Sequence, residues 1–193
     1  MPGAFCAALG GLAESSAVLI MSRLTVVYDE VLIAKRVDEL AKEIAETLPK
    51  DIVLLAILKG GAVFAADLLR RLGCAGMEPE IEFLRLESYG SGRKSLGAVR
   101  VSGVPPDLTG RAVLVTDAIV ETGHSLRVAQ RIVASAGAVR AWTCVLVEKP
   151  GRQEPVAVDF AGFQAGSGFL VGYGTDAAGA YRHLPSLATL DDR

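Results

Sequence analysis

Two residue types with distinctive chemistry are scarce in this chain of 193 residues. It contains two histidines and three cysteines, and Cys6, Cys74 and Cys144 lie far apart with no C-x-x-C pair among them. A structural zinc site needs closely spaced Cys and His ligands, and a disulfide framework needs an even set of cysteines. The sequence therefore predicts free thiols, a reducing cytoplasmic location and no structural zinc.

The chain also lacks a run of Lys and Arg and an apolar run of membrane-spanning length. Its formal net charge is −2, from 20 Lys and Arg against 22 Asp and Glu, so electrostatics do not favour a nucleic-acid partner. No stretch reaches the roughly 18 apolar residues that a membrane helix needs. Because 51% of the residues are hydrophobic, the composition indicates a globular protein with a small-molecule partner.

The first twenty residues, MPGAFCAALGGLAESSAVLI, resemble a signal peptide only superficially. They have no basic start, and Glu14 interrupts their apolar stretch, so we expect no secretory signal. The part with recognisable elements begins at Met21. We expect residues 1–20 to be a disordered leader and residues 21–193 to form a single domain, for which the chain length is sufficient.

Apolar periodicity divides the remaining chain into alternating helices and strands. Helices are expected from a cap at Asp29 to about Leu48, after the Lys59-Gly60-Gly61 turn, and from about Gly123 to Ala136. Strands are expected at 52–58, 81–90, 97–103, 112–117 and 140–148, with two shorter strands within 156–176. This alternation predicts an α/β fold, a mostly parallel twisted sheet flanked by helices. Ligands of such sheets bind beyond the carboxyl ends of the strands.

Two carboxylates lie where one of these strands gives way to a helix. The stretch VLVTDAIVETGHS places Asp117 and Glu121 before a Thr-Gly-His-Ser turn. Such a turn presents backbone N–H groups and a hydroxyl to an anion, although an ordinary helix cap has the same sequence. Because a strand-end carboxylate can accept hydrogen bonds from vicinal hydroxyls, the combination predicts a site for a ribose 5-phosphate.

Further motifs follow in the order found in the hypoxanthine-guanine phosphoribosyltransferases, which the chain resembles over roughly residues 24–190. The motifs are ILKGG at 57–61, RLESYG at 85–90, LVEKP at 146–150, FLVGYGTD at 169–176 and AYRHLP at 180–185. The resemblance implies the type I phosphoribosyltransferase fold, with a small hood formed by the N- and C-terminal segments. It also implies a purine-salvage enzyme, active as a homodimer or homotetramer, that uses Mg²⁺ and phosphoribosyl pyrophosphate to convert hypoxanthine or guanine to its nucleotide.

The resemblance assigns binding of the donor to residues from separate loops: Lys59, Gly60, Asp117, Thr122, Gly123, His124, Ser125 and Arg182. In the family, the loop that corresponds to Leu58-Lys59-Gly60 contacts pyrophosphate through its backbone and often has a non-proline cis peptide. Arg182 corresponds to a bidentate pyrophosphate clamp. No role is assigned to the side chains of His124 and His183, which we expect to be exposed.

Binding of the purine is assigned to four residues, Lys149, Phe169, Leu170 and Asp176. By resemblance, Lys149 donates to the 6-oxo group and Phe169 stacks on the base, whose edge contacts the Leu170 backbone. Asp176 and Asp117 are the expected Mg²⁺ ligands.

The catalytic assignments implied by the resemblance are Glu121, Ser88 and Tyr89. Glu121 corresponds to an aspartate near the purine N7 that accepts a proton or stabilises charge. Ser88 and Tyr89 begin a lid that would shield the reacting sugar from water.

The acidic motif departs from the family pattern, which has two adjacent acids at the strand end and an aspartate before Thr-Gly. This chain has Asp117-Ala118 and then Glu121, and Thr175 where the family tends to have an aliphatic residue. Two alternatives therefore stay open. One is a catalytically weak relative that binds a nucleotide as a sensor or accessory subunit. The other is an enzyme of the same fold for another base, since the single acid resembles uracil phosphoribosyltransferases, although their C-terminal signature is absent.

Overall fold

The computed structural model describes residues 24–88, 99–102 and 106–190. The predictions for residues 1–20, for Tyr89 and for most of the lid lie outside these ranges, and Ser88 is described only as the last residue of a strand. Among the helices of the described ranges, none combines the length and the apolar character needed to cross a membrane.

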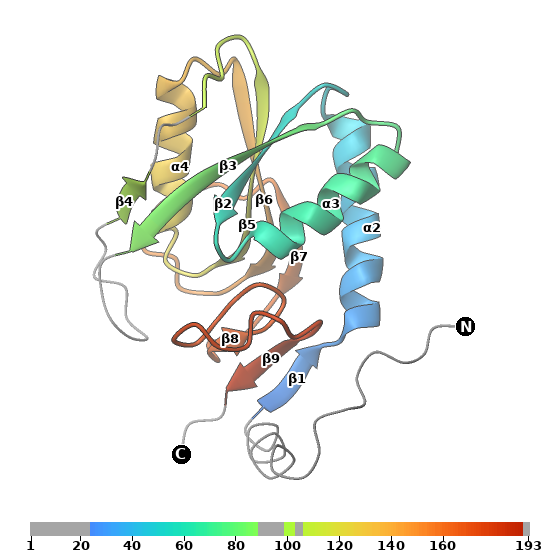
Figure 1. The fold of residues 1–193 in the computed structure, drawn as a ribbon, viewed down its shortest axis with the longest axis vertical. Helices are drawn as coiled ribbons and strands as arrows, with labels where there is room; N and C mark the ends of the chain where they lie inside the picture. The colour runs from blue at the N-terminus through green and yellow to red at the C-terminus, as the bar shows by residue number, and fades with distance from the viewer. Residues whose placement is uncertain (1–23, 89–98, 103–105, 191–193) are drawn as a thin grey trace, which may run out of the picture.

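A six-stranded sheet forms the body of the protein (Figure 1). Its strands are β2 (Val53–Leu58), β3 (Glu80–Ser88), β4 (Val99–Ser102), β5 (Ala112–Val120), β6 (Arg140–Glu148) and β7 (Phe160–Gln164). The order is β4-β3-β2-β5-β6-β7, and all neighbours pair in parallel except β3 and β4. The predicted α/β fold with a mostly parallel sheet is confirmed.

Three helices cover the two faces of this sheet. They are α2 (Glu30–Thr47), α3 (Ala62–Cys74) and α4 (His124–Ser135). Side chains of β2 alternate between the faces: Leu54 packs in the core that includes α2 and α3, whereas Leu55 packs in the core that includes α4. A strand buried on both faces is apolar throughout, as the predicted run at 52–58 is. The predicted cap is also present, since Asp29 Oδ1 accepts from the Leu32 N–H at 2.8 Å.

A smaller antiparallel sheet forms the hood that the resemblance implies. It contains β1 (Leu24–Tyr28), β8 (Leu170–Val171) and β9 (Leu187–Leu190) in the order β1-β9-β8. Figure 1 shows this sheet below the body, near the carboxyl ends of its parallel strands. Segments from the two ends of the described chain thus cover the edge where a ligand is expected.

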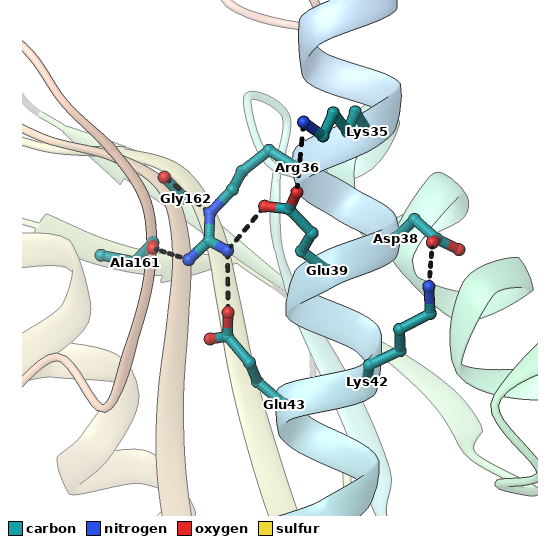
Figure 2. A network of polar contacts seen from close by, with 8 residues as sticks. All are labelled: Lys35, Arg36, Asp38, Glu39, Lys42, Glu43, Ala161 and Gly162. Carbon is teal, nitrogen blue, oxygen red and sulfur yellow. Dashed lines mark hydrogen bonds and ion pairs between the residues drawn. The ribbon is translucent and has the colours of Figure 1, made fainter.

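Arg36 of α2 ties this helix to the edge strand β7 (Figure 2). Its Nε donates to the Gly162 carbonyl at 2.9 Å and its Nη2 to the Ala161 carbonyl at 3.0 Å. Nη1 contacts Glu39 at 3.2 Å and Glu43 at 2.8 Å, and the Arg36 side chain is only 22% exposed. Because unpaired carbonyls on an edge strand invite pairing with another chain, these bonds both anchor α2 and protect the edge.

Replacing Arg36 with Ala should lower the free energy of unfolding by about 1–2 kcal/mol, since hydrogen bonds to a charged and partly buried donor are lost. Chemical denaturation measures the change. The matched control is Lys42→Ala, which removes an exposed ion pair of 2.6 Å to Asp38 from the same helix. That variant should unfold almost as the native chain does, because exposed pairs contribute little. Equal losses in the two variants would contradict the anchoring role.

Candidate functional site

A cavity of about 510 Å³ lies between the carboxyl ends of the parallel strands and the hood. Ten of the residues singled out in the sequence line it: Lys59, Gly60, Asp117, Glu121, Ser125, Lys149, Phe169, Leu170, Asp176 and Arg182. They come from the loops after β2, β5 and β6, from β5 itself, from the start of α4 and from the hood. The fold therefore brings most of the sequence-predicted residues to one place.

The Thr-Gly-His-Ser turn lines an adjoining cavity of about 540 Å³, which also includes Asp117 and Glu121. Gly123 has φ 86°, in the left-handed region that favours glycine. The loop after β6 stabilises the turn, because the Thr122 carbonyl accepts hydrogen bonds from the N–H groups of Gln153 at 3.1 Å and Glu154 at 3.0 Å. Helix α4 begins directly after the glycine, so its free N–H groups lie at this cavity, as an anion site requires.

Strand β5 is longer than the sequence predicted. The expected strand ended at Asp117, but pairing with β6 continues from Asp117↔Val145 to Val120↔Glu148. The polar residue does not break the ladder, because only backbone groups pair there. Asp117 therefore lies inside the strand, and Glu121 is the first residue beyond it.

Asp117 lines the cavity and is partly shielded from solvent by the surrounding protein. Burial raises its pKa to about 7, and a hydrogen bond from the Ala118 N–H to Oδ1, 2.8 Å long, opposes that rise. The preceding loop packs against this residue, since a Cβ on Gly61 would come within 3.2 Å of Asp117 Cα and a Cβ on Gly60 would lie 3.9 Å from its Oδ1. Ala118, where the family has its second acid, is 1% exposed.

Lys149 and Glu121 form an ion pair at the cavity wall. Lys149 Nζ lies 2.8 Å from Glu121 Oε1, with the lysine side chain 4% exposed and the glutamate 58% exposed. The Lys149 N–H also donates to the Val120 carbonyl at 2.9 Å. A buried ammonium group needs such a partner. The pair places a hydrogen-bond donor and an acceptor side by side, an arrangement that the sequence did not predict.

Asp176 and Arg182 are also paired. Arg182 Nη2 lies 2.5 Å from Asp176 Oδ1, and Asp176 Oδ2 accepts from the Gly179 N–H at 2.6 Å. Arg182 Nη1 donates to the Gly174 carbonyl at 2.5 Å. These contacts orient the guanidinium group of Arg182, which lines the cavity from the hood.

The acids of the site fit Mg²⁺ in the way that phosphate-binding enzymes use it. The described residues contain no group of three or more His, Cys, Asp or Glu that could hold a metal by themselves. Mg²⁺ commonly binds through one or two carboxylates together with substrate phosphates and water. Asp117 and Asp176 line the same cavity and could supply those carboxylates.

Some details of the site differ from the sequence analysis. His124 is not exposed as expected: its side chain is 22% exposed and its Nδ1 lies 3.2 Å from Glu154 Oε1. His183 is exposed, as predicted.

Arg85 lines the main cavity but was not singled out. The sequence feature that could have identified Arg85 is its position near the end of β3, where it pairs with Leu58 of β2. The Leu58–Lys59 peptide bond is cis, as the resemblance implied.

Comparisons with known proteins agree with this geometry. The phosphoribosyl transferase domain family matches residues 25–178. Hypoxanthine phosphoribosyltransferase of Escherichia coli K12 is 34% identical over 165 residues, which cover 83% of this chain and 91% of the relative. Hypoxanthine-guanine phosphoribosyltransferase of Dictyostelium discoideum is 34% identical over 176 residues, 89% of this chain and 97% of the relative. The crystal structure of a Staphylococcus aureus hypoxanthine phosphoribosyltransferase superposes with a TM-score of 0.80 at 28% identity, covering 90% of this chain and 95% of that one.

The raised pKa of Asp117 predicts a pH-dependent cost to stability. Between about pH 4 and pH 7 the unfolded chain has lost this proton while the folded chain keeps it, so stability falls as pH rises through that window. Asp117→Asn cannot titrate and should remove this part of the pH dependence. Chemical denaturation at pH 5 and pH 8 should show the variant gaining stability relative to the native chain at the higher pH. A constant difference at both pH values would contradict the burial of the carboxyl group.

Proposed function

This chain belongs to the hypoxanthine-guanine phosphoribosyltransferase family, and from that premise we propose its reaction. It transfers the 5-phosphoribosyl group of 5-phosphoribosyl 1-pyrophosphate to a 6-oxopurine, hypoxanthine or guanine, in purine salvage. The observation that carries the proposal is the ion pair between the buried Lys149 and the more exposed Glu121, which lines the same cavity as Asp117.

The base is recognised by the ion pair of Lys149 and Glu121, which follow β6 and β5 directly. The Lys149 ammonium group donates to the 6-oxo oxygen, and Glu121 accepts from the neighbouring N7–H. The 6-amino group of adenine would instead face the ammonium group with its own donors, which leaves polar groups unpaired. Phe169 lines the cavity from the hood and supplies an apolar ring on which the base stacks.

The donor is held at both of its charged ends. The turn before α4 binds the 5-phosphate with backbone N–H groups, and Asp117 accepts from the ribose hydroxyls. The Lys59-Gly60 loop and Arg182, which line the same cavity, bind the pyrophosphate. Mg²⁺, when bound through Asp117 and Asp176, would neutralise pyrophosphate charge. Binding both ends positions the sugar carbon against the base.

The chemical step forms one bond and breaks one. A ring nitrogen of the purine forms a bond to the anomeric carbon, while the bond from that carbon to the pyrophosphate oxygen breaks and its electron pair leaves with pyrophosphate. The proton that the base loses from N7 goes to Glu121. Arg182 stabilises the charge that develops on the leaving group. A lid that begins at Ser88 and Tyr89 would exclude water, which could otherwise attack the same carbon.

The proposal extends to location and assembly as the sequence suggested them. Cys74 and Cys144 are free thiols, which supports a reducing cytoplasm. A homodimer or homotetramer is proposed on family membership alone.

One observation favours a second candidate, a nucleotide-binding sensor. Ala118 occupies the position of the family's second acid, so a ribose contact is missing. A sensor would bind nucleotide through Asp117 and the turn without turnover above background. Purified protein incubated with the donor and a purine therefore separates the two functions.

Turnover should be measured by absorbance with hypoxanthine, guanine, xanthine, adenine and uracil. The proposal predicts rapid use of hypoxanthine or guanine and poor use of adenine, because only a 6-oxo group accepts from Lys149. Lys149→Ala should lose both activity and this preference, while the control Lys50→Ala at an exposed site should keep both. Equal use of adenine and hypoxanthine by the native protein would overturn the assignment of Lys149.

A further inference from the structure

A hydrogen bond joins helix α3 to the turn that follows β8 in the hood. Tyr173 Oη donates to Asp67 Oδ2, and Asp67 also contacts Arg70 on the surface of α3. We propose that the Asp67–Tyr173 pair is a positioning device that fixes the spacing between the Gly60 loop and Arg182, and thereby the affinity for pyrophosphate. The inference rests on the proposed function, in which these two elements hold the pyrophosphate end of the donor.

Tyr173 is connected to Arg182 through the backbone. The Tyr173 N–H donates to the Leu184 carbonyl at 2.8 Å, and the Gly174 N–H donates to the Arg182 carbonyl at 3.0 Å. The Arg182 guanidinium group returns a hydrogen bond to the Gly174 carbonyl at 2.5 Å. A shift of Tyr173 would therefore move the Arg182 side chain with it.

The same turn touches the other pyrophosphate element directly. A Cβ on Gly174 would lie 2.6 Å from the Gly60 carbonyl oxygen, so the two loops are in close contact. Helix α3, which carries Asp67, begins at Ala62 shortly after that loop. The contacts close a ring from α3 through Asp67, Tyr173 and Gly174 to Gly60 and back to α3.

The turn that carries Tyr173 packs against the core and also borders two cavities. The main cavity, of about 510 Å³, is lined by Thr175 of the turn, and a second cavity, of about 690 Å³, is lined by Asp67, Tyr173 and Arg182. Tyr173 also has φ 46°, a left-handed conformation that is uncommon for a bulky residue. Because its backbone conformation is unfavourable, the turn depends on the hydrogen bonds of Tyr173 as well as on its packing.

The Tyr173 hydroxyl group is a dependable donor in this setting. The residue is 6% exposed. Burial, and then the neighbouring Asp67 carboxylate, raise the pKa of the phenol well above its ordinary value. The hydroxyl therefore keeps its proton throughout the pH range in which the enzyme would work.

The test measures pyrophosphate affinity by calorimetry with Mg²⁺ present, together with kcat and the KM for the donor. Tyr173→Phe removes the donor and Asp67→Ala removes the acceptor. Each should weaken pyrophosphate binding and raise the donor KM by about five- to tenfold, the effect of one lost hydrogen bond. Asp67→Asn keeps an acceptor oxygen and should restore near-native affinity. The double variant Asp67→Ala/Tyr173→Phe should be no weaker than either single variant.

The control is Tyr28→Phe, which removes a tyrosine hydrogen bond of 2.9 Å to the Gln164 carbonyl at the β7 edge. It should lose stability to a similar extent and keep native pyrophosphate affinity. If Tyr28→Phe weakens pyrophosphate binding equally, or if Tyr173→Phe binds it as the native protein does, the positioning role is overturned. Native protein that binds no pyrophosphate at all would instead contradict the proposed function from which the inference starts.

Discussion

The ammonium group of Lys149 is buried with one carboxylate beside it, and the rest of the site depends on this pairing. Lysine at 4% exposure is rare because its charge must leave water. Two adjacent parallel strands make the pairing possible, since Val120 of β5 lies opposite Glu148 of β6, and the partner residues follow them directly. The cavity wall therefore presents a hydrogen-bond donor and an acceptor side by side, which supports the base recognition proposed above.

Other residues at the cavity also occupy states that a purely structural protein would avoid. Burial disfavours the charged form of Asp117, and Tyr173 adopts a left-handed backbone conformation. These features reduce the stability of the fold. A loss of stability in return for fixed polar groups is expected at a functional site. The uncharged core of the body compensates: β2, β5 and β6 are almost continuously buried, with α2 and α3 on one face and α4 on the other.

Much of the body could be predicted from the sequence because its strands are apolar on both faces. The strand at 140–148 has the predicted bounds, since nine residues of strand character end at a clear turn. The predicted end of β5 was wrong, because backbone pairing with β6 continues past the polar side chain of Asp117. Strands β1 and β9 were not predicted, since segments of 5 and 4 residues carry too little periodicity. The hood itself was expected only from the resemblance.

Most residues that line the cavity were singled out in the sequence, but their contacts were not. The family resemblance pointed to Lys149 and Glu121, yet their 2.8 Å approach depends on which strands lie side by side. The contact between His124 and Glu154 likewise joins segments whose proximity no local pattern shows. Arg85 was missed because a charged residue on a strand resembles any solvated position. Long-range register, rather than local propensity, determines each of these contacts.

We propose separate tasks for the two acids near the end of β5: Asp117 binds the donor, and Glu121 serves the chemistry beside Lys149. Steady-state kinetics with hypoxanthine, combined with calorimetric donor affinity, on Glu121→Gln and Asp117→Asn test it most directly. The account predicts that Glu121→Gln lowers kcat by about 10²–10⁴-fold with little change in donor affinity. It predicts that Asp117→Asn mainly weakens donor binding, by about 10- to 100-fold. A native protein with background turnover and intact nucleotide binding, or equal kinetic effects of the two substitutions, would contradict it.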